Sequence, residues 1–351
     1  MRPLLATLLL LAAAPLPAQA LKSVRDWVGA CDNTRHCTAL GLAPDSAEHD
    51  AMLHFERGAA AQDAVTKLTL RVGHPLPRGL HWIVVDEKQQ TLLTLTDQHL
   101  VDADSGEGID VVFESPQDIS TLLGSLRTAA ALTLVGDGGP VGTVSLSGAS
   151  AVLLWIDEQQ RRLGTTTAFV RRGAADAATI PAAPPAPRAP LKSTVGIALG
   201  AEDGKAAGIA VRKTLSEEDC ESPDPERASA DQAWALSDGR TLVQLLCFSG
   251  AYNFGSRLYL LDTAGSVLPL AVPVPQEDGT LASELDLINA DFDADRGRLH
   301  SFAKGRGIGD CGSVGEWAWT AEGFRLVSYR SFPDCRGVTP DFWPVRWQSA
   351  D

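Results

Sequence analysis

The sequence has 351 residues, a formal net charge of −14 and 44% hydrophobic residues. Such an acidic chain is a poor match for nucleic acid or for an anionic lipid surface, because both select basic proteins. The length is sufficient for two hydrophobic cores of ordinary globular composition.

The first 20 residues are predicted to be a secretory signal peptide. Arg2 precedes the apolar run 4–14, and Ala18 and Ala20 form an A-x-A end. These are the three parts of an export signal, and the run is shorter than the roughly 20 residues that span a bilayer. We expect cleavage after about Ala20 and a soluble periplasmic chain without a transmembrane segment or a lipid anchor. A retained membrane anchor is the alternative.

The first part of the mature chain, residues 21–173, is expected to mix strands with a few helices. Residues 65–72 alternate with period two, so that Leu68, Leu70 and Val72 share a face. Further strand-like runs lie at 81–85, 91–96, 109–113 and 131–135.

Two helices are predicted in this part. The first has Ser115 as its cap and Pro116 at its first position, and an apolar face follows at residues 119–126. The second is expected to run from a Ser147 cap to Gly164 with Val152, Trp155 and Ile156 buried. Its far end carries charged residues that we interpret as solvated surface, namely Asp157, Glu158, Arg161 and Arg162.

The stretch 173–190 is predicted to mark a domain boundary. It contains five prolines among alanines, and these cannot sustain a helix or a strand ladder. We therefore expect an extended linker at 174–190 between domains at 21–173 and 191–351.

The second domain is predicted to be a meander of hairpins. Four turns that contain glycine, near residues 239, 265, 297 and 323, lie between runs rich in Leu, Val and aromatic residues. About eight strands follow from this spacing, too few for a full propeller. The predicted fold class is mostly β with a few helices, an α+β first domain and a β-meander, sandwich or barrel in the second.

Six cysteines follow the leader, and an even number in an exported protein is typical of disulfides. Six cysteines permit 15 pairings. Spacing favours neighbours, that is Cys31–Cys37, Cys220–Cys247 and Cys311–Cys335. A zinc site is the weaker alternative, because no C-x-x-C pair is present. We expect no metal and no cofactor.

The glycine-rich loop at 304–312 is the most suggestive binding element. Lys304 and Arg306 could pair with an anion, and the glycines would let the backbone approach a ligand. Asp310 and Arg336, which lie beside two of the cysteines, complete the candidate ligand residues. The order of residues is not a phosphate-loop pattern. A tight structural loop held by a bridged Cys311 is the favoured alternative.

A catalytic interpretation would use Cys311 as nucleophile with Asp310 nearby and His300 or another histidine as base. It requires a free thiol with a lowered pKa, which a disulfide would remove. Neither G-x-S-x-G nor H-E-x-x-H occurs in the sequence. We therefore assign no catalytic residue.

Three other groups of residues could bind a metal or a ligand, but each has a simpler structural interpretation. The acidic clusters at 289–295 and 102–110 could suggest a calcium site, but an EF-hand loop counted from Asp291 has Arg296 in place of its glycine and Phe302 in place of its glutamate, and Asp and Gly also form ordinary turns. His49 and His54 are spaced poorly for one helical face. The aromatics and arginines at 343–347 could bind a ligand, but a lid that closes the β domain is the simpler interpretation.

Several motifs occur together in a specific order. They are Asp26-Trp27-Val28 with Cys31-Asp32-Asn33 and Cys37, the segments 144–150, 155–157, 250–253 and 304–312, Cys335-Arg336-Gly337 and Trp343-Pro344. This order resembles an exported proteobacterial family catalogued as domain of unknown function 1176. The W-x-x-x-C opening and the S-L-S-G segment are also distantly similar to invasion-associated locus B proteins of the cell envelope. The resemblance implies a periplasmic location and carries over no catalytic residues.

We therefore predict a non-enzymatic periplasmic protein that binds an envelope protein, a glycan or a small ligand. An exported hydrolase or transferase with its site at 304–311 is the alternative, and an inhibitor of another envelope enzyme is the third class.

Overall fold

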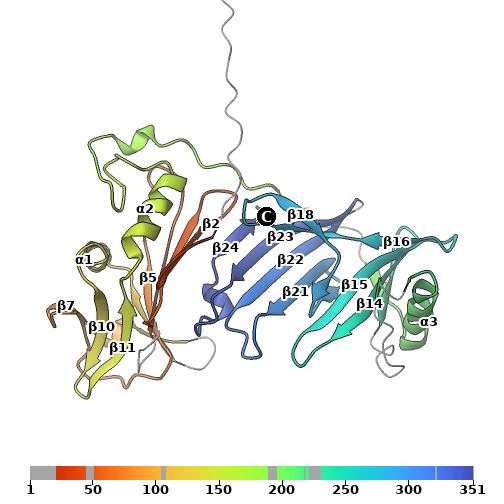
Figure 1. The fold of residues 1–351 in the computed structure, drawn as a ribbon, viewed down its shortest axis with the longest axis horizontal. Helices are drawn as coiled ribbons and strands as arrows, with labels where there is room; N and C mark the ends of the chain where they lie inside the picture. The colour runs from red at the N-terminus through yellow and green to blue at the C-terminus, as the bar shows by residue number, and fades with distance from the viewer. Residues whose placement is uncertain are drawn as a thin grey trace, which may run out of the picture.

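The computed structural model describes residues 21–44, 51–103, 108–188, 196–216, 219–220, 231–320 and 322–350. Strands dominate these residues, and three α-helices accompany them (Figure 1). The predicted mostly β fold with a few helices is confirmed. The predicted signal peptide, His49 and the acidic residues Asp104 and Glu107 lie outside the described residues.

A seven-stranded antiparallel sheet forms the centre of the first half. Its strands lie in the order β1-β2-β3-β4-β5-β9-β8. A second sheet has the order β11-β10-β6-β7. The bounds are β1 Lys22–Val24, β2 Trp27–Cys31, β3 Cys37–Gly41, β4 Ala51–Arg57, β5 Leu68–Val72, β6 Ile83–Asp86, β7 Thr91–Thr94, β8 Leu100–Asp102, β9 Ile109–Phe113, β10 Ala131–Gly136 and β11 Gly139–Ser145, with a 3-10 turn η1 at Asp97–His99.

Helices α1 (Pro116–Ser125) and α2 (Ala149–Gln159) contribute to the same core as these sheets. Ser115 caps α1 as predicted and accepts a hydrogen bond from the Asp118 amide. Helix α2 is shorter than predicted. Its cap is Gly148, with φ 102°, where a Cβ atom would approach the Val24 carbonyl oxygen. Arg161, with φ 59°, lies just beyond the other end in a conformation that does not continue a helix.

The interpretation of the far end of α2 as solvated surface is wrong for two of its four residues. Glu158 and Arg161 are exposed, but Asp157 and Arg162 are fully buried. Asp157 pairs with Arg57 of β4, at 2.8 Å from Asp157 Oδ1 to Arg57 Nη2. Helical periodicity does not reveal such partners, because they come from a strand about 100 residues away in the sequence.

The second half consists of two larger antiparallel sheets and one small one. Their orders are β12-β13-β14-β15-β16, with β19 beside β15, then β20-β21-β22-β23-β24, and β17-β18. The bounds are β12 Gly196–Ala198, β13 Gln232–Leu236, β14 Thr241–Ser249, β15 Phe254–Leu261, β16 Val267–Leu270, β17 Val272–Pro275, β18 Leu281–Glu284, β19 Leu287–Ile288, β20 Asp291–Asp293, β21 Arg298–Lys304, β22 Gly312–Thr320, β23 Gly323–Phe332 and β24 Val345–Gln348, with a 3-10 turn η4 at Pro340–Phe342.

All four predicted hairpin turns are present. Gly239, Gly265, Gly297 and Gly323 have positive φ values, as such turns require. They join β13 to β14, β15 to β16, β20 to β21 and β22 to β23. The alternation of turn glycines with apolar runs therefore predicts these four hairpins correctly.

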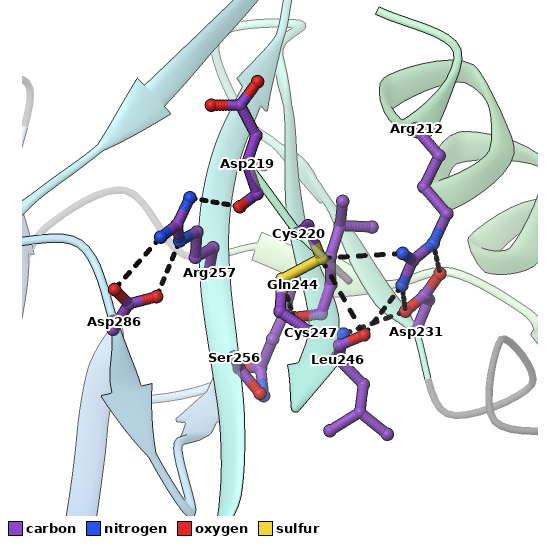
Figure 2. The surroundings of a disulfide bond; sticks show 11 residues. Arg212, Asp219, Cys220, Asp231, Gln244, Leu246, Cys247, Ser256, Arg257 and Asp286 are labelled. Atoms are coloured by element: carbon purple, nitrogen blue, oxygen red, sulfur yellow. Dashed lines mark hydrogen bonds and ion pairs between the residues drawn. A yellow bond between two sulfur atoms is a disulfide. The ribbon is translucent and has the colours of Figure 1, made fainter. Parts of the chain in front are cut away.

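Helix α3 (Ala201–Arg212) was not predicted. Its buried positions include Gly204, Gly208 and Val211, so that glycines occupy the face where apolar side chains would normally reveal a helix. At Gly208, a Cβ atom would come within 2.8 Å of Asp231 Oδ2. Arg212 ends the helix and pairs with Asp231 beside the Cys220–Cys247 bond (Figure 2).

The two halves meet on the outer face of the seven-stranded sheet. Figure 1 shows β2 facing β24 across this contact, and the two strands are neighbours. Val28, Leu40 and Met52 of the first half form one buried cluster with Phe332 and Trp343 of the second.

The proline-rich stretch between the halves is in contact with both of them. The Pro187 carbonyl accepts a hydrogen bond from the Ala350 amide at 2.8 Å. The Arg35 guanidinium donates to the carbonyls of Pro181 and Ala182. A 3-10 turn, η2 at Ala177–Thr179, interrupts the expected extended chain. The division into two domains stays a prediction.

Candidate functional site

The glycine-rich loop between β21 and β22 is closed by an internal ion pair. Arg306 donates from Nε and Nη2 to the two Asp310 oxygens at 2.6 and 2.5 Å. Asp310 also accepts the Gly337 amide at 2.7 Å. The hydrogen bonds from Arg306 lower the pKa of Asp310, which is therefore ionised at neutral pH. This ion pair braces the loop, and the Arg306 side chain remains about half exposed.

All six cysteines form disulfides in the structure. The bonds are Cys31–Cys37, Cys220–Cys247 and Cys311–Cys335, the neighbour pairs that spacing favours. Cys311 thus has no thiol to act as a nucleophile. Two of the cysteines lie near Asp310 oxygen, but bonded sulfurs are not the thiolates that a metal requires.

The two cations of the loop point to different places. Lys304 lines a groove with Tyr329 and Arg346, close to the 343–347 cluster. Arg306 instead lines a cavity of about 440 Å³ between the two halves, together with Arg336. The structure therefore brings Arg306 and Arg336 together and separates them from Lys304.

A third arginine, Arg71 of β5, lines the same cavity from the opposite half. Sequence analysis did not single it out, because it stands between the core residues Leu70 and Val72. Alternation in that strand was the available signal, since it places residue 71 on the outer face of the sheet. The contact with the second half then converts this outer position into part of the cavity wall.

The remaining wall of the cavity is apolar. Leu42, Met52 and Val338 are buried beneath it, whereas Ile308 stands exposed at its rim. Among the described residues that line this cavity there is no carboxylate. The arrangement offers arginine N–H donors above an apolar floor.

Each cavity arginine has a carboxylate neighbour outside the lining. Arg336 Nη2 lies 2.9 Å from Asp26 Oδ1, and Arg71 Nη1 lies 3.5 Å from Asp110 Oδ1. Arg336 also donates to the Ala43 carbonyl. These contacts hold the guanidinium groups in defined orientations, as preorganised binding requires.

A second cleft of about 750 Å³ lies on the other side of Phe342. Phe342 is 5.1 Å from the Arg71 guanidinium and 5.2 Å from the His54 ring. In this cleft the Glu56 carboxylate lies 3.1 Å from His36 Nε2 and 3.7 Å from His54 Nε2. Hydrogen bonding between His36 and Glu56 raises the pKa of His36 and holds that of Glu56 well below its usual range.

One protein family matches both halves of the chain. Residues 21–350 match the family model described as "Protein of unknown function (DUF1176)". The chain belongs to the DUF1176 family. It is also 30% identical over 350 residues to "Uncharacterized protein YpfG" of Escherichia coli (strain K12), which covers 94% of this chain and 93% of that protein. No solved structure matches the chain.

The DUF1176 match confirms the resemblance drawn from the ordered motifs. It extends across both halves, so the cavity walls at 42–73 and 306–338 both lie within the DUF1176 region. The similarity to invasion-associated locus B proteins stays a prediction. No helix among the residues that the structure describes is long and apolar enough to span a bilayer.

Proposed function

We propose that this protein is an exported, non-enzymatic periplasmic protein that binds a small anion in the cavity between its halves. Arg71, Arg306 and Arg336 come from three separate elements and converge on that cavity. These three arginines gather at one place although the chain as a whole has a net charge of −14, and this local positive charge supports a negatively charged ligand.

Arginine suits this task for a geometric reason. Its planar guanidinium presents N–H groups as a fork that matches the oxygens of a carboxylate or a phosphate. In the loop, Arg306 lines the cavity but directs Nε and Nη2 at Asp310, so a ligand there would meet the Nη1 side of this guanidinium. A volume of about 440 Å³ falls in the range of small-molecule sites.

The proposed location rests on the disulfides and on the sequence of the leader. Disulfides persist in oxidising compartments such as the periplasm, and three of them join all six cysteines. Residues 1–20 have the composition of an export signal. A hydrolase built on Cys311 is a poorer proposal, because that sulfur is bonded to Cys335.

Calorimetric titration of the mature, disulfide-bonded chain tests the proposal. The titrants are acetate, octanoate, citrate, sulfate and inorganic phosphate at low ionic strength. We expect at least one to bind, and Arg306→Gln or Arg71→Gln to weaken that binding about tenfold or more, the usual effect of losing a charged hydrogen bond.

Arg240→Gln is the matched control. Arg240 also pairs with an aspartate, Asp238, but it does not line the cavity. We expect this variant to bind the anion as the wild type does. The proposal fails if none of the five anions binds, or if Arg240→Gln weakens binding as much as the two cavity variants.

A further inference from the structure

The charges that the described residues place around the cavity are balanced. Arg306 faces Asp310 at 2.5 Å, Arg336 faces Asp26 at 2.9 Å and Arg71 faces Asp110 at 3.5 Å. Within the part of the chain that the structure describes, three guanidinium charges are thus opposed by three carboxylate charges outside the lining. These described residues supply directed N–H donors and a local positive potential, but little net charge.

This balance favours an anion of low charge. A ligand with one negative charge leaves one charge uncompensated in the site, whereas a dianion leaves two. Uncompensated charge is expensive in a partly buried site, and the chain is already acidic overall. A planar carboxylate has two oxygens that can accept N–H groups from more than one arginine, and it adds the smallest charge of the anions considered.

The apolar part of the cavity indicates what is attached to the carboxylate. Leu42, Met52 and Val338 form a buried floor. At the rim, Ile308 is 77% exposed, a large fraction for an isoleucine. Covering such a side chain is favourable by about 25 cal/mol per Å² of apolar surface.

The exposure of Ile308 is built into the loop. Gly309 has φ 72°, and a Cβ atom at Gly307 would stand 3.4 Å from the Tyr252 ring. The Arg306–Asp310 ion pair and the Cys311–Cys335 bond close the loop on both sides of this turn. The backbone therefore holds Ile308 at the cavity mouth.

We infer that the ligand is an amphiphilic monocarboxylate, with its carboxylate on Arg71, Arg306 and Arg336 and an apolar tail that runs over the floor to Ile308. This inference rests on the proposed function and names the class of its ligand. The tail is compact, because the cavity volume of about 440 Å³ lies toward the small end of ligand sites.

A matched series of ligands tests the head group. Octanol, octanoate and octylphosphonate have alkyl tails of nearly equal length, and they carry no charge, one charge and close to two charges at a pH of about 8.5, above the second ionisation of phosphate-type groups. We expect octanoate to bind at least about tenfold more tightly than either of the others, since one charged hydrogen-bonded contact is of that size.

The proposed contact between the apolar tail of the ligand and Ile308 is tested with the variant Ile308→Ser. We expect this variant to bind octanoate about threefold to fivefold more weakly and to leave butyrate binding unchanged, because only the longer tail reaches the rim. The control is Ile197→Ser, which changes an isoleucine that is 76% exposed but lies outside the cavity. Both side chains are exposed, so neither substitution removes core packing.

The charge balance itself is tested with Asp26→Asn, which removes one of the three opposing carboxylates. We expect the affinity for octylphosphonate to rise relative to that for octanoate. Tighter binding of octylphosphonate than of octanoate by the wild type would overturn the inference and leave the proposed anion site intact. Equal binding of octanol and octanoate would overturn it too, whereas failure of every anion would reject the proposed function itself.

Discussion

Arg57 Nη2 lies 2.8 Å from Asp157 Oδ1 in the interior of the first half, where the two side chains are 3% and 0% exposed. The same carboxylate accepts the amides of Phe169 and Val170 at 2.9 and 3.0 Å. Burial lowers the pKa of Arg57 to about 10, which still leaves it charged at neutral pH. The pair ties strand β4 to the end of α2 and to the loop that follows.

We expect Asp157→Asn to destabilise the protein by about 3–5 kcal/mol, because it leaves the buried Arg57 charge uncompensated. Urea unfolding followed by circular dichroism measures the loss. Glu158→Gln is the control, since Glu158 is the next residue of α2 but is exposed. Its effect should stay within about 0.5 kcal/mol. Equal effects of the two substitutions would show that the buried pair contributes little.

The hairpins and the disulfides could be predicted because their signals are local. A hairpin turn often requires a residue with positive φ, which favours glycine, as at Gly239. The strands on either side of the turn can be recognised from their composition. Six cysteines permit 15 pairings, and the three bonds of the structure are those between cysteines that are neighbours in the sequence. Helix α1 was likewise encoded within a few residues, by Ser115 and Pro116.

The cavity and the buried ion pairs could not be predicted, because the residues that form them are far apart in the sequence. Arg71 and Arg336 are 265 positions apart in the sequence, and only the contact between the halves makes them neighbours. In the sequence, Asp157 has no feature that distinguishes it from an exposed acidic residue at a helix end, because its partner Arg57 is 100 residues away. Arg306 and Asp310 were within reach of sequence analysis, since both lie in one short loop.

The His36–Glu56 pair is predicted to make stability depend on pH. The hydrogen bond between the two side chains raises the pKa of His36 and lowers that of Glu56. The His36 contribution is complete below the unfolded histidine pKa of 6.5 and is lost as pH rises through its higher folded value. The Glu56 contribution is present above 4.5 and is lost as pH falls through its lower folded value.

The pair should therefore be most stabilising between these two limits, and His54, Asp32 and Asp63 face it and modulate it. We expect Glu56→Gln to lower the melting temperature more at pH about 5.5 than at pH about 8.5. The effect should stay below about 1 kcal/mol, since His36 and Glu56 are 34% and 39% exposed. Glu202→Gln, an exposed change on α3, is the control. Equal losses at both pH values would contradict the assignment.

The Cys220–Cys247 bond anchors the segment after α3 to strand β14 (Figure 2). It closes a loop with a sequence separation of 27, for which the chain-entropy model gives about 3.5 kcal/mol. We expect the double variant Cys220→Ala, Cys247→Ala to lose stability of that order in urea unfolding. Nearby, Arg212 keeps its bidentate contact with Asp231 and its bond to the Leu246 carbonyl, so the fold should persist.

Replacement of Cys31 and Cys37 by alanine provides the comparison, because their sequence separation is only 6. The same model gives about 2.2 kcal/mol for that smaller loop. A larger loss for the Cys31–Cys37 pair than for Cys220–Cys247 would mean that the folded state, rather than loop closure, determines the contribution of these bonds.

Trp343 is the largest side chain in the cluster that joins the two halves, and it is almost completely buried. Its indole Nε1 donates to the Val338 carbonyl at 2.8 Å, and its ring lies 5.8 Å from that of Phe302. We expect Trp343→Ala to cost about 3–5 kcal/mol. Because the loss falls at the contact between the halves, calorimetry should show one wild-type transition dividing into two.

Trp82→Ala is the matched control, since Trp82 is also buried but belongs to the core of the first half alone. It should cost a similar free energy and leave the contact between Val28, Leu40 and Trp343 in place. The halves would then still unfold together, at a lower temperature. If Trp343→Ala also unfolds in one transition, the contact is not what couples the halves, and the proline-rich segment that touches both becomes the better explanation.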